Sequence, residues 1–163
     1  MIDASSVINF YNADALDAIC KLEGARFVLC PLVIGECSAG CVAKLIELRE
    51  RGDITWLDDT QIPAELYLDL LETYGLGEGE TESLAAGRVL GMGLCCDDKQ
   101  ARTVASDLIG QDKVIGSAGV LKLCVEEGCV DCQLANEIFA LMRIAGGFLP
   151  TLPSTYFCDG VVC

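Results

Sequence analysis

The amino-acid sequence predicts an α/β protein: three α/β/α layers around a central parallel sheet of about four to five short strands. Short apolar segments alternate with helical patterns along the chain, and such alternation is typical of a parallel sheet covered on both faces. Two of the apolar segments end in aspartate, at Asp3 and at Asp97 with Asp98. Ligands bind at the carboxyl ends of strands in an open parallel sheet. We therefore expect a functional site built from carboxylates at that edge.

The N-terminal elements follow from apolar spacing and helix-start residues. A short apolar lead ends at Asp3. Residues 6–21 then carry apolar side chains at helical spacing and predict a helix, with Ser5 or Ser6 as its N-cap. Residues 26–30, R-F-V-L-C, predict a short buried strand, after which Pro31 suits the first turn of another helix. Glu36 is the lone acid of that helix, so it either faces solvent or is placed there for chemistry.

The middle of the chain continues the alternation. Residues 41–51 have the apolar spacing of an amphipathic helix, and Gly52 ends it. Residues 54–57 predict a strand or an extended link. Another amphipathic helix is expected at residues 63–74, with Gly75 at its end.

The next helix opens with a cluster of acids behind glycines, Glu78, Glu80 and Glu82. Acids in the first turn of a helix interact favourably with the helix dipole, by ~0.3–1 kcal/mol each. That interaction does not explain why three glutamates crowd together, because their mutual repulsion offsets the benefit. We therefore consider both a helix-stabilising and a functional role for them.

The last expected elements repeat the logic of the N-terminus. The strand expected at residues 93–98 ends in two aspartates, and the helix expected at residues 99–109 starts with Lys99 and Arg102 in its first turn. Basic side chains at a helix start are unfavourable for the dipole, which suggests a use beyond helix stability. The remaining predicted elements are a strand at 113–116 and helices at 117–127 and 131–145.

Length and composition predict one soluble domain, residues 1–150, followed by an irregular tail, residues 151–163. The chain has 163 residues, of which 52% are hydrophobic, so disorder is not expected. Its apolar runs are far shorter than the ~18 residues of a membrane span. No basic region precedes an apolar one at the start of the sequence, so we expect no secretory signal, no membrane association and a cytoplasmic location.

Charge and residue usage restrict the chemistry. The net charge is −14, from 11 basic and 25 acidic residues; it indicates either solubility through repulsion or a carboxylate cluster that takes up cations. The absence of histidine excludes Ser-His-Asp and Cys-His catalysis. Most of the 11 cysteines lie in apolar contexts and are interpreted as small buried residues. A structural zinc site is not expected, because it needs four suitably spaced ligands.

The acids that follow strands or open helices would converge on one cleft in a doubly wound sheet. They are Asp3, Glu36, Glu80 with Glu82, and Asp97 with Asp98. Converging carboxylates raise each other's pKa unless a cation relieves the repulsion. With oxygen ligands alone, Mg²⁺ or Mn²⁺ is the expected ion. One or two such ions would activate a water towards phosphorus and stabilise the leaving oxygen.

The motifs that carry these acids resemble the PIN domain family, and most closely its VapC-type branch of bacterial and archaeal toxins. They are M-I-D-A-S-S-V-I, P-L-V-I-G-E, G-L-G-E-G-E-T-E-S-L-A-A, D-D-K-Q-A-R-T-V-A and V-I-G-S-A-G-V-L, spread over residue 1 to about residue 150. The resemblance implies a Mg²⁺- or Mn²⁺-dependent endoribonuclease that cleaves RNA. It also implies a cognate antitoxin that blocks the cleft, and a homodimer.

The resemblance assigns roles residue by residue. The catalytic and metal-binding acids would be Asp3, Glu36, Glu80 and Asp98, with Asp97 as a further metal ligand. Supporting roles fall to Ser5 beside the first aspartate, Glu82 close to Glu80, and Lys99 and Arg102 facing a substrate phosphate.

Two other hypotheses come from different classes of protein. A PIN-like module that has lost catalysis would bind protein partners only, and its acids would be solvated. A redox protein built on Cys129 and Cys132 is disfavoured, because this C-x-x-C is expected between helices and not after a strand.

Overall fold

The computed structural model describes residues 1–159, and it has the α/β organisation that the sequence predicts. The strands of this described part are β1 (Phe27–Leu29), β2 (Ile54–Trp56), β3 (Leu94–Cys95) and β4 (Val114–Ile115). The helices are α1 (Ala4–Asn12), α2 (Leu16–Ile19), α3 (Pro31–Glu36), α4 (Ala39–Glu50), α5 (Ala64–Tyr74), α6 (Glu78–Leu90), α7 (Lys99–Ile109), α8 (Ser117–Glu126) and α9 (Cys132–Ile144). Short 3-10 turns occur at Asp59–Gln61 and Gln111–Lys113.

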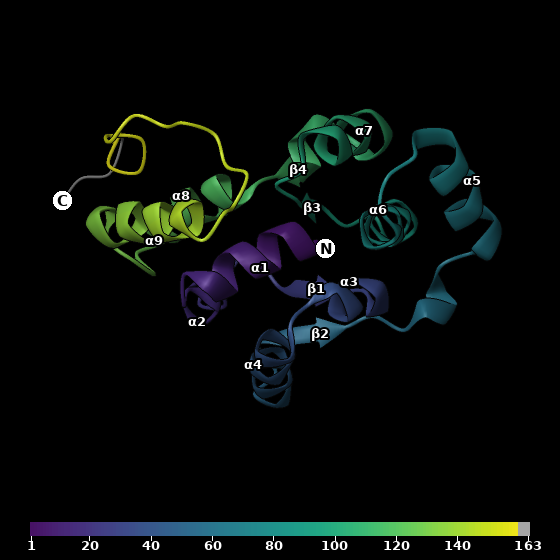
Figure 1. Cartoon of the computed structure of the whole chain (residues 1–163), viewed down its shortest axis with the longest axis horizontal. Coiled ribbons are helices and arrows are strands. Elements are labelled where there is room, and N and C mark those ends of the chain that lie inside the picture. Colours follow the sequence, from purple (N-terminus) through teal and green to yellow (C-terminus); the bar gives the residue numbers. More distant parts are fainter. Residues whose placement is uncertain (160–163) are drawn as a thin grey trace.

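The predicted single sheet of four to five strands is not confirmed. The strands form two parallel pairs, β1 with β2 and β3 with β4. The N-terminal segment lies between the pairs: the Ile2 amide donates to the Val28 carbonyl at 3.0 Å, and the Asp3 amide donates to the Cys95 carbonyl at 2.9 Å. This segment is too short to be a regular strand, because α1 begins at Ala4. Figure 1 shows the N-terminus in the middle of the molecule, with the β1–β2 pair on one side and the β3–β4 pair on the other.

The first helix differs from the expectation of one helix over residues 6–21. Asp3, and not a serine, is the N-cap of α1, and its side chain accepts a hydrogen bond from the Ser5 amide. The helical run is then interrupted at Asp14, which has a φ of 52°, a conformation that Asp tolerates better than most residues. α2 follows as a separate short helix. The later helices agree with prediction to within two residues at most ends, as amphipathic patterns with clear stop residues allow.

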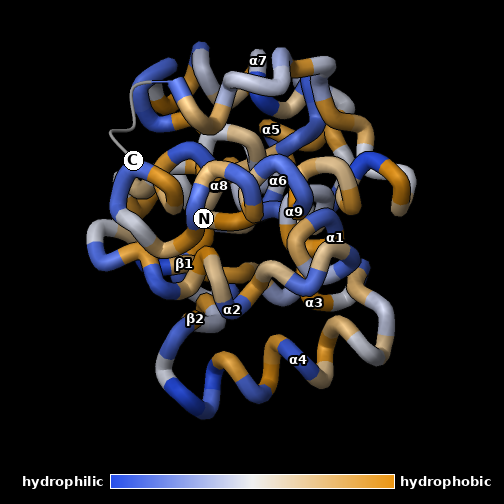
Figure 2. The backbone as a smooth tube through the Cα atoms, turned by 90° about the vertical axis from the view of Figure 1, so that its left-hand side faces the viewer, coloured by the Kyte–Doolittle hydropathy of each residue, from blue (hydrophilic) through white to orange (hydrophobic). Residues whose placement is uncertain are grey.

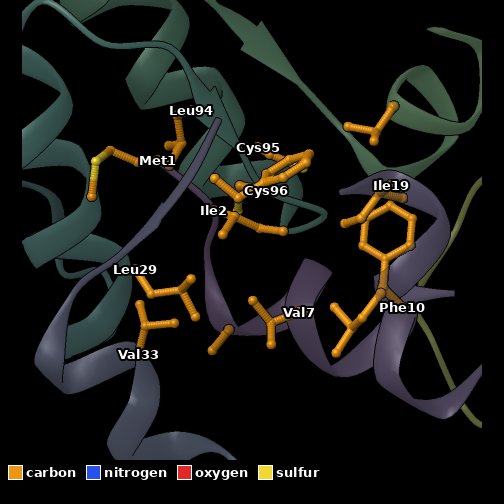
Figure 3. Packing of buried hydrophobic residues seen from close by; sticks show 14 of the residues in the cluster. Met1, Ile2, Val7, Phe10, Ile19, Leu29, Val33, Leu94, Cys95 and Cys96 are labelled. Carbon is orange, nitrogen blue, oxygen red and sulfur yellow. The ribbon is translucent and has the colours of Figure 1, made fainter. Parts of the chain in front are cut away.

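The core lies on both sides of the N-terminal segment. Figure 3 shows Ile2 between Leu94 and Leu29, and all three side chains are at most 2% exposed. Because buried side chains of this size each stabilise the fold by ~1.5–3 kcal/mol, this packing holds residues 1–3 between the strand pairs. Asp3 is carried into the interior by its apolar neighbours.

α4 lies along one edge of the molecule, and Figure 2 shows hydrophilic and hydrophobic residues alternating along it. Its buried residues include Leu45 and Leu48, each at most 1% exposed. This helix therefore covers the β1–β2 side and turns its charged side chains outwards, as the sequence predicts for residues 41–51.

The C-terminal tail is irregular over residues 151–159, where it contains turns and backbone outside any helix or strand. The rest of the predicted tail, residues 160–163, lies outside the described residues. A disulfide joins Cys158 to Cys132 at the start of α9, with their Cα atoms 5.1 Å apart. Phe157 is 1% exposed and packs edge-to-face on Phe139, with ring centroids 5.6 Å apart. The tail is therefore fixed to α9. The interpretation of the cysteines as buried apolar residues does not hold for this pair.

None of the helices between residues 1 and 159 combines the length and the apolar character needed to cross a bilayer.

Candidate metal centre

Asp3 is a buried carboxylate with one oxygen that has no partner. Its side chain is 1% exposed. Oδ2 accepts hydrogen bonds from the Ser5 amide at 3.2 Å, from Ser5 Oγ at 2.8 Å and from Cys96 Sγ at 3.4 Å. Oδ1 is buried and accepts no hydrogen bond from the described residues. Because an unpaired buried polar atom is costly, this oxygen marks a place where a cation would be stabilising.

Glu80 faces Asp3 from the first turn of α6. Its Oε2 accepts a hydrogen bond from the Gly77 amide at 3.0 Å, the return contact of a capping box. One carboxylate oxygen of Glu80, one of Asp3 and the sulfur of Cys96 lie within 4.8 Å of one another. The capping contact thus holds the Glu80 side chain beside the buried aspartate.

Glu36 reaches the same helix start from the end of α3. Its Oε1 accepts a hydrogen bond from the Gly79 amide at 3.2 Å. A Cβ at position 79 would displace this oxygen, so glycine allows the Glu36 carboxylate to approach the helix start this closely. The sequence G-E-G-E therefore supplies one acid and leaves room for another to approach the helix N-terminus.

Asp98 completes the group as the N-cap of α7, where its Oδ1 accepts a hydrogen bond from the Ala101 amide at 2.8 Å. Burial raises the pKa of Glu80, and the negative charges of Asp3, Asp98 and Glu36 raise it further. Burial also raises the pKa of Glu36, with Asp3 as the next cause. The four predicted acids are therefore close enough to repel each other, and we call them the cleft acids.

Asp97 faces a different set of partners. Its Oδ1 accepts a hydrogen bond from the Ser117 amide at 2.8 Å. Its Oδ2 accepts from Ser117 Oγ, from Asn9 Nδ2 at 2.8 Å and from Ser6 Oγ at 3.2 Å. Three of these four hydrogen bonds end on Oδ2, so the second lone pair of Oδ1 is the acceptor site that they leave free. These contacts make Asp97 a link between α1 and the start of α8, and its role as a metal ligand stays a prediction.

Glu82 also serves structure. It is 5% exposed, and its Oε2 accepts a hydrogen bond from the Leu32 amide at 2.8 Å, in the first turn of α3. Burial raises the pKa of this carboxyl, and the hydrogen bond from Leu32 opposes the change. Glu82 therefore fixes the start of α3 against α6.

Ser5 lies between the two aspartate sites. Its hydroxyl donates to Asp3 and accepts a hydrogen bond from the Asp97 amide at 3.1 Å. This side chain therefore holds Asp3 in one orientation relative to the end of β3.

A cavity of about 600 Å³ opens above these residues. The acids and bases on its wall are Glu80, Asp97, Asp98, Lys99 and Arg102, and residues 146–150 form another side. Asp3 and Cys96 do not line the cavity and are almost completely buried, and Asp3 is linked to the wall by the hydrogen bond from Ser5. The two basic side chains, predicted from their unfavourable place at a helix start, thus share one cavity with two of the cleft acids.

Sequence reasoning missed Cys96 and the donors to Asp97. Cys96 immediately follows β3 and is fully buried; burial, together with the charge of Asp3, raises the pKa of its thiol. An apolar context in the sequence suggested only packing for this residue. Asn9 and Ser117 carry a weak signal, since each is a buried polar residue at helical spacing or at a helix start.

Comparison with known proteins defines the class. A family model described as "PIN domain" matches residues 1–151, which is most of the chain, so the protein belongs to the PIN domain family. Comparisons with curated proteins and with solved structures found no match. PIN domains are commonly nucleases that bind divalent metal ions. The buried unpaired oxygen of Asp3 and the oxygens of Glu80 fit a divalent cation.

Proposed function

We propose that the protein is a Mg²⁺- or Mn²⁺-dependent endoribonuclease of the VapC-type toxin branch, which hydrolyses RNA phosphodiester bonds. The observation that carries the proposal is the unpartnered, buried Oδ1 of Asp3, on a carboxylate that lies beside the carboxylate of Glu80. Acids kept together only for solubility would face water, whereas Asp3 is 1% exposed. Their arrangement is explained if they bind a cation.

Each residue has a defined role in this proposal. Asp3 and Glu80 would hold the ion, and Glu36 and Asp98 would complete its surroundings. When bound, Mg²⁺ or Mn²⁺ supplies Lewis-acid activation of water and stabilises negative charge at the phosphate. Ser5 keeps the Asp3 carboxylate oriented through its 2.8 Å hydrogen bond.

The substrate would lie in the cavity beside these acids. Lys99 and Arg102 line it and would bind RNA phosphates, which offsets the repulsion between the backbone and the cleft acids. Their positions in the first turn of α7 give a functional reason for basic residues that are unfavourable for the helix dipole.

The toxin assignment adds a cognate antitoxin, a homodimer and a cytoplasmic location to the proposal. Phe148 lines the cavity and is 99% exposed, and nearby in the sequence Ile144 is 81% exposed. Large apolar side chains in water favour a protein partner, and the rim of the cavity is where an inhibitor of cleavage would act.

The test is cleavage of end-labelled single-stranded RNA by the full chain with Mn²⁺ or Mg²⁺. We expect Asp3→Asn to lower the rate about 100-fold or more, since it removes a ligand charge. Asp17→Asn is the matched control, because Asp17 is an exposed aspartate paired with Lys44 and Arg51, and it should cleave as the wild type does. Equal cleavage by Asp3→Asn and the wild type would contradict the proposal.

A catalytically inactive interaction module is the second hypothesis, favoured by the net charge of −14. It predicts that the wild-type protein cleaves no RNA under any metal condition but still binds a protein partner. Cleavage that depends on Asp3 would exclude it.

A further inference from the structure

We propose that Cys96 is a metal ligand together with Asp3 and Glu80, and that the centre therefore prefers a thiolate-binding transition-metal ion over Mg²⁺. This inference rests on the metal site of the proposed function and makes no use of RNA as the substrate. It departs from the oxygen-only site that sequence reasoning predicts.

The first observation is the position of the sulfur. Cys96 is fully buried directly after β3, and its Sγ lies 3.4 Å from Asp3 Oδ2 and 3.8 Å from Ser5 Oγ. The sulfur and one oxygen each of Asp3 and Glu80 are mutually within 4.8 Å. A single cation placed among these three atoms would contact all of them after small side-chain adjustments.

The second observation is the free oxygen beside it. Asp3 Oδ1 is buried and has no hydrogen-bond partner within residues 1–159, while Oδ2 has three. The thiol, hydroxyl and amide donors all bond Oδ2, so they leave the desolvation of Oδ1 uncompensated. An ion would give that oxygen a partner and would offset its desolvation.

Cys95 shows that this placement is specific to Cys96. Neighbouring residues at a strand end point to opposite sides, and Figure 3 shows Cys95 and Cys96 side by side near Ile2. Both are buried. Cys95 contacts Asp3 through its backbone carbonyl, whereas Cys96 donates a hydrogen bond from its thiol to the Asp3 carboxylate. Within residues 1–159, Asp3, Glu80 and Cys96 are also the one group of three acidic or sulfur side chains whose possible ligand atoms all lie within 4.8 Å of one another.

The chemistry of the donor set decides the ion. Mg²⁺ demands oxygen ligands in a nearly regular octahedron. Thiolates bind ions such as Co²⁺ and Zn²⁺, and carboxylates are compatible with both classes. Binding releases the thiol proton to solvent, which leaves the thiolate as the ligand. Two carboxylates with one thiolate therefore match a transition-metal ion better than Mg²⁺.

The test is titration of the full chain with Co²⁺, followed by near-ultraviolet absorption. Thiolate coordination gives Co²⁺ a charge-transfer band that oxygen ligands do not give. We expect the band in the wild type and in Cys95→Ser, and its loss in Cys96→Ser and in Asp3→Asn. The Co²⁺ affinity should fall about 10-fold or more in Cys96→Ser, whereas calorimetry should show Mg²⁺ binding weakly and equally in the wild type and this variant.

The two serine variants place the same hydroxyl in neighbouring buried positions, so the comparison controls for loss of stability. Cys96→Ala, checked for folding by circular dichroism, is the second variant and should also lose the band. Other thiols of the chain would contribute equally to all samples and cancel in the difference spectrum. A band that persists unchanged in Cys96→Ser, or Mg²⁺ binding as tight as that of Co²⁺ in the wild type, would overturn the proposal.

RNA cleavage separates this inference from the proposed function. Cleavage that requires Asp3, combined with a Co²⁺ band that is independent of Cys96, would contradict the thiolate ligand alone. A Cys96-dependent Co²⁺ site in a protein that cleaves no RNA would contradict the nuclease proposal alone.

Discussion

Two groups of carboxylates in this molecule have opposite surroundings. The cleft acids are Asp3, Glu36, Glu80 and Asp98, and the surface ion-pair cluster consists of Asp17, Lys44, Glu47, Arg51 and Asp53. On the surface, Asp17 lies 2.6 Å from Lys44 Nζ and 2.6 Å from Arg51 Nη2. No cleft acid forms an ion pair with a basic side chain of residues 1–159.

The pKa values reflect this difference. Hydrogen bonds from Lys44 and Arg51 lower the pKa of Asp17, whereas burial and neighbouring acids raise the pKa of Glu80. Every acid of the surface cluster is paired with Lys44 or Arg51, while the cleft acids have no basic partner within residues 1–159. We conclude that the effect of each carboxylate on stability follows the partners that the chain provides for it.

Asp97 should give the largest effect on stability, because it has the most partners. Asp97→Ala would leave donors of Ser6, Asn9 and Ser117 buried without an acceptor. We expect a loss of about 3 kcal/mol or more in the free energy of unfolding, measured with urea. Asp98→Ala, which removes one N-cap contact, should cost about 1 kcal/mol or less. Equal losses in the two variants would contradict the distinction between these neighbours.

Glu80→Gln should change stability in the opposite direction. The amide oxygen can still accept the hydrogen bond from Gly77, while the repulsion from the other cleft acids is removed. In chelator at neutral pH we expect a gain of about 0.5–1 kcal/mol, kept small by partial solvation of the site. Glu47→Gln on the surface is the control and should give no gain, because Glu47 is paired with Lys44 and Arg51.

The difference in stability between Glu80→Gln and the wild type should depend on pH. A carboxyl whose folded pKa is raised binds more protons in the folded state, so its unfavourable contribution is absent below its unfolded pKa and develops as pH rises through the folded pKa. The Glu80 pKa is raised, so the advantage of Glu80→Gln should vanish in acid and grow towards neutral pH. Urea unfolding of both proteins from acid to neutral pH measures this gain in stability. A gain that is constant with pH would exclude repulsion between carboxylates as its cause.

Arg51→Met should have the smallest effect. Arg51 pairs with Asp17, Glu47 and Asp53, but these side chains are exposed or half-buried at the surface, and surface ion pairs contribute little. Asp17 has a lowered pKa, so its contribution exists above its unfolded pKa and is lost as pH falls through the folded value. Thermal unfolding at low salt and at high salt measures the loss of stability in Arg51→Met. This small loss should disappear at high salt because the charges are screened.

The fold class and most helices could be predicted because their signals are local. The helix at Ala64–Tyr74 follows an amphipathic pattern and ends at Gly75, whose φ of 60° favours glycine. The sheet could not be predicted to the same degree. Its central segment, residues 1–3, is fixed by hydrogen bonds to Val28 and Cys95, and such contacts between distant residues leave no periodic trace in the sequence.

The candidate site shows the same limit. The acids at Asp3, Glu80 and Asp98 stood out because each follows a strand or opens a helix. Asp97 and Asp98 could not be distinguished, since the direction of each side chain depends on where β3 ends. Cys96 was interpreted as apolar packing, and only the three-dimensional arrangement brings its sulfur to Asp3.

The most direct test of a cation demand at the cleft acids is calorimetric titration of the full chain with Mn²⁺. We predict one saturable Mn²⁺ site in the wild type and in Asp17→Asn, and an affinity lower by about 10–100-fold or more in Asp3→Asn. Identical binding in all three proteins, or no saturable binding in the wild type, would contradict the account.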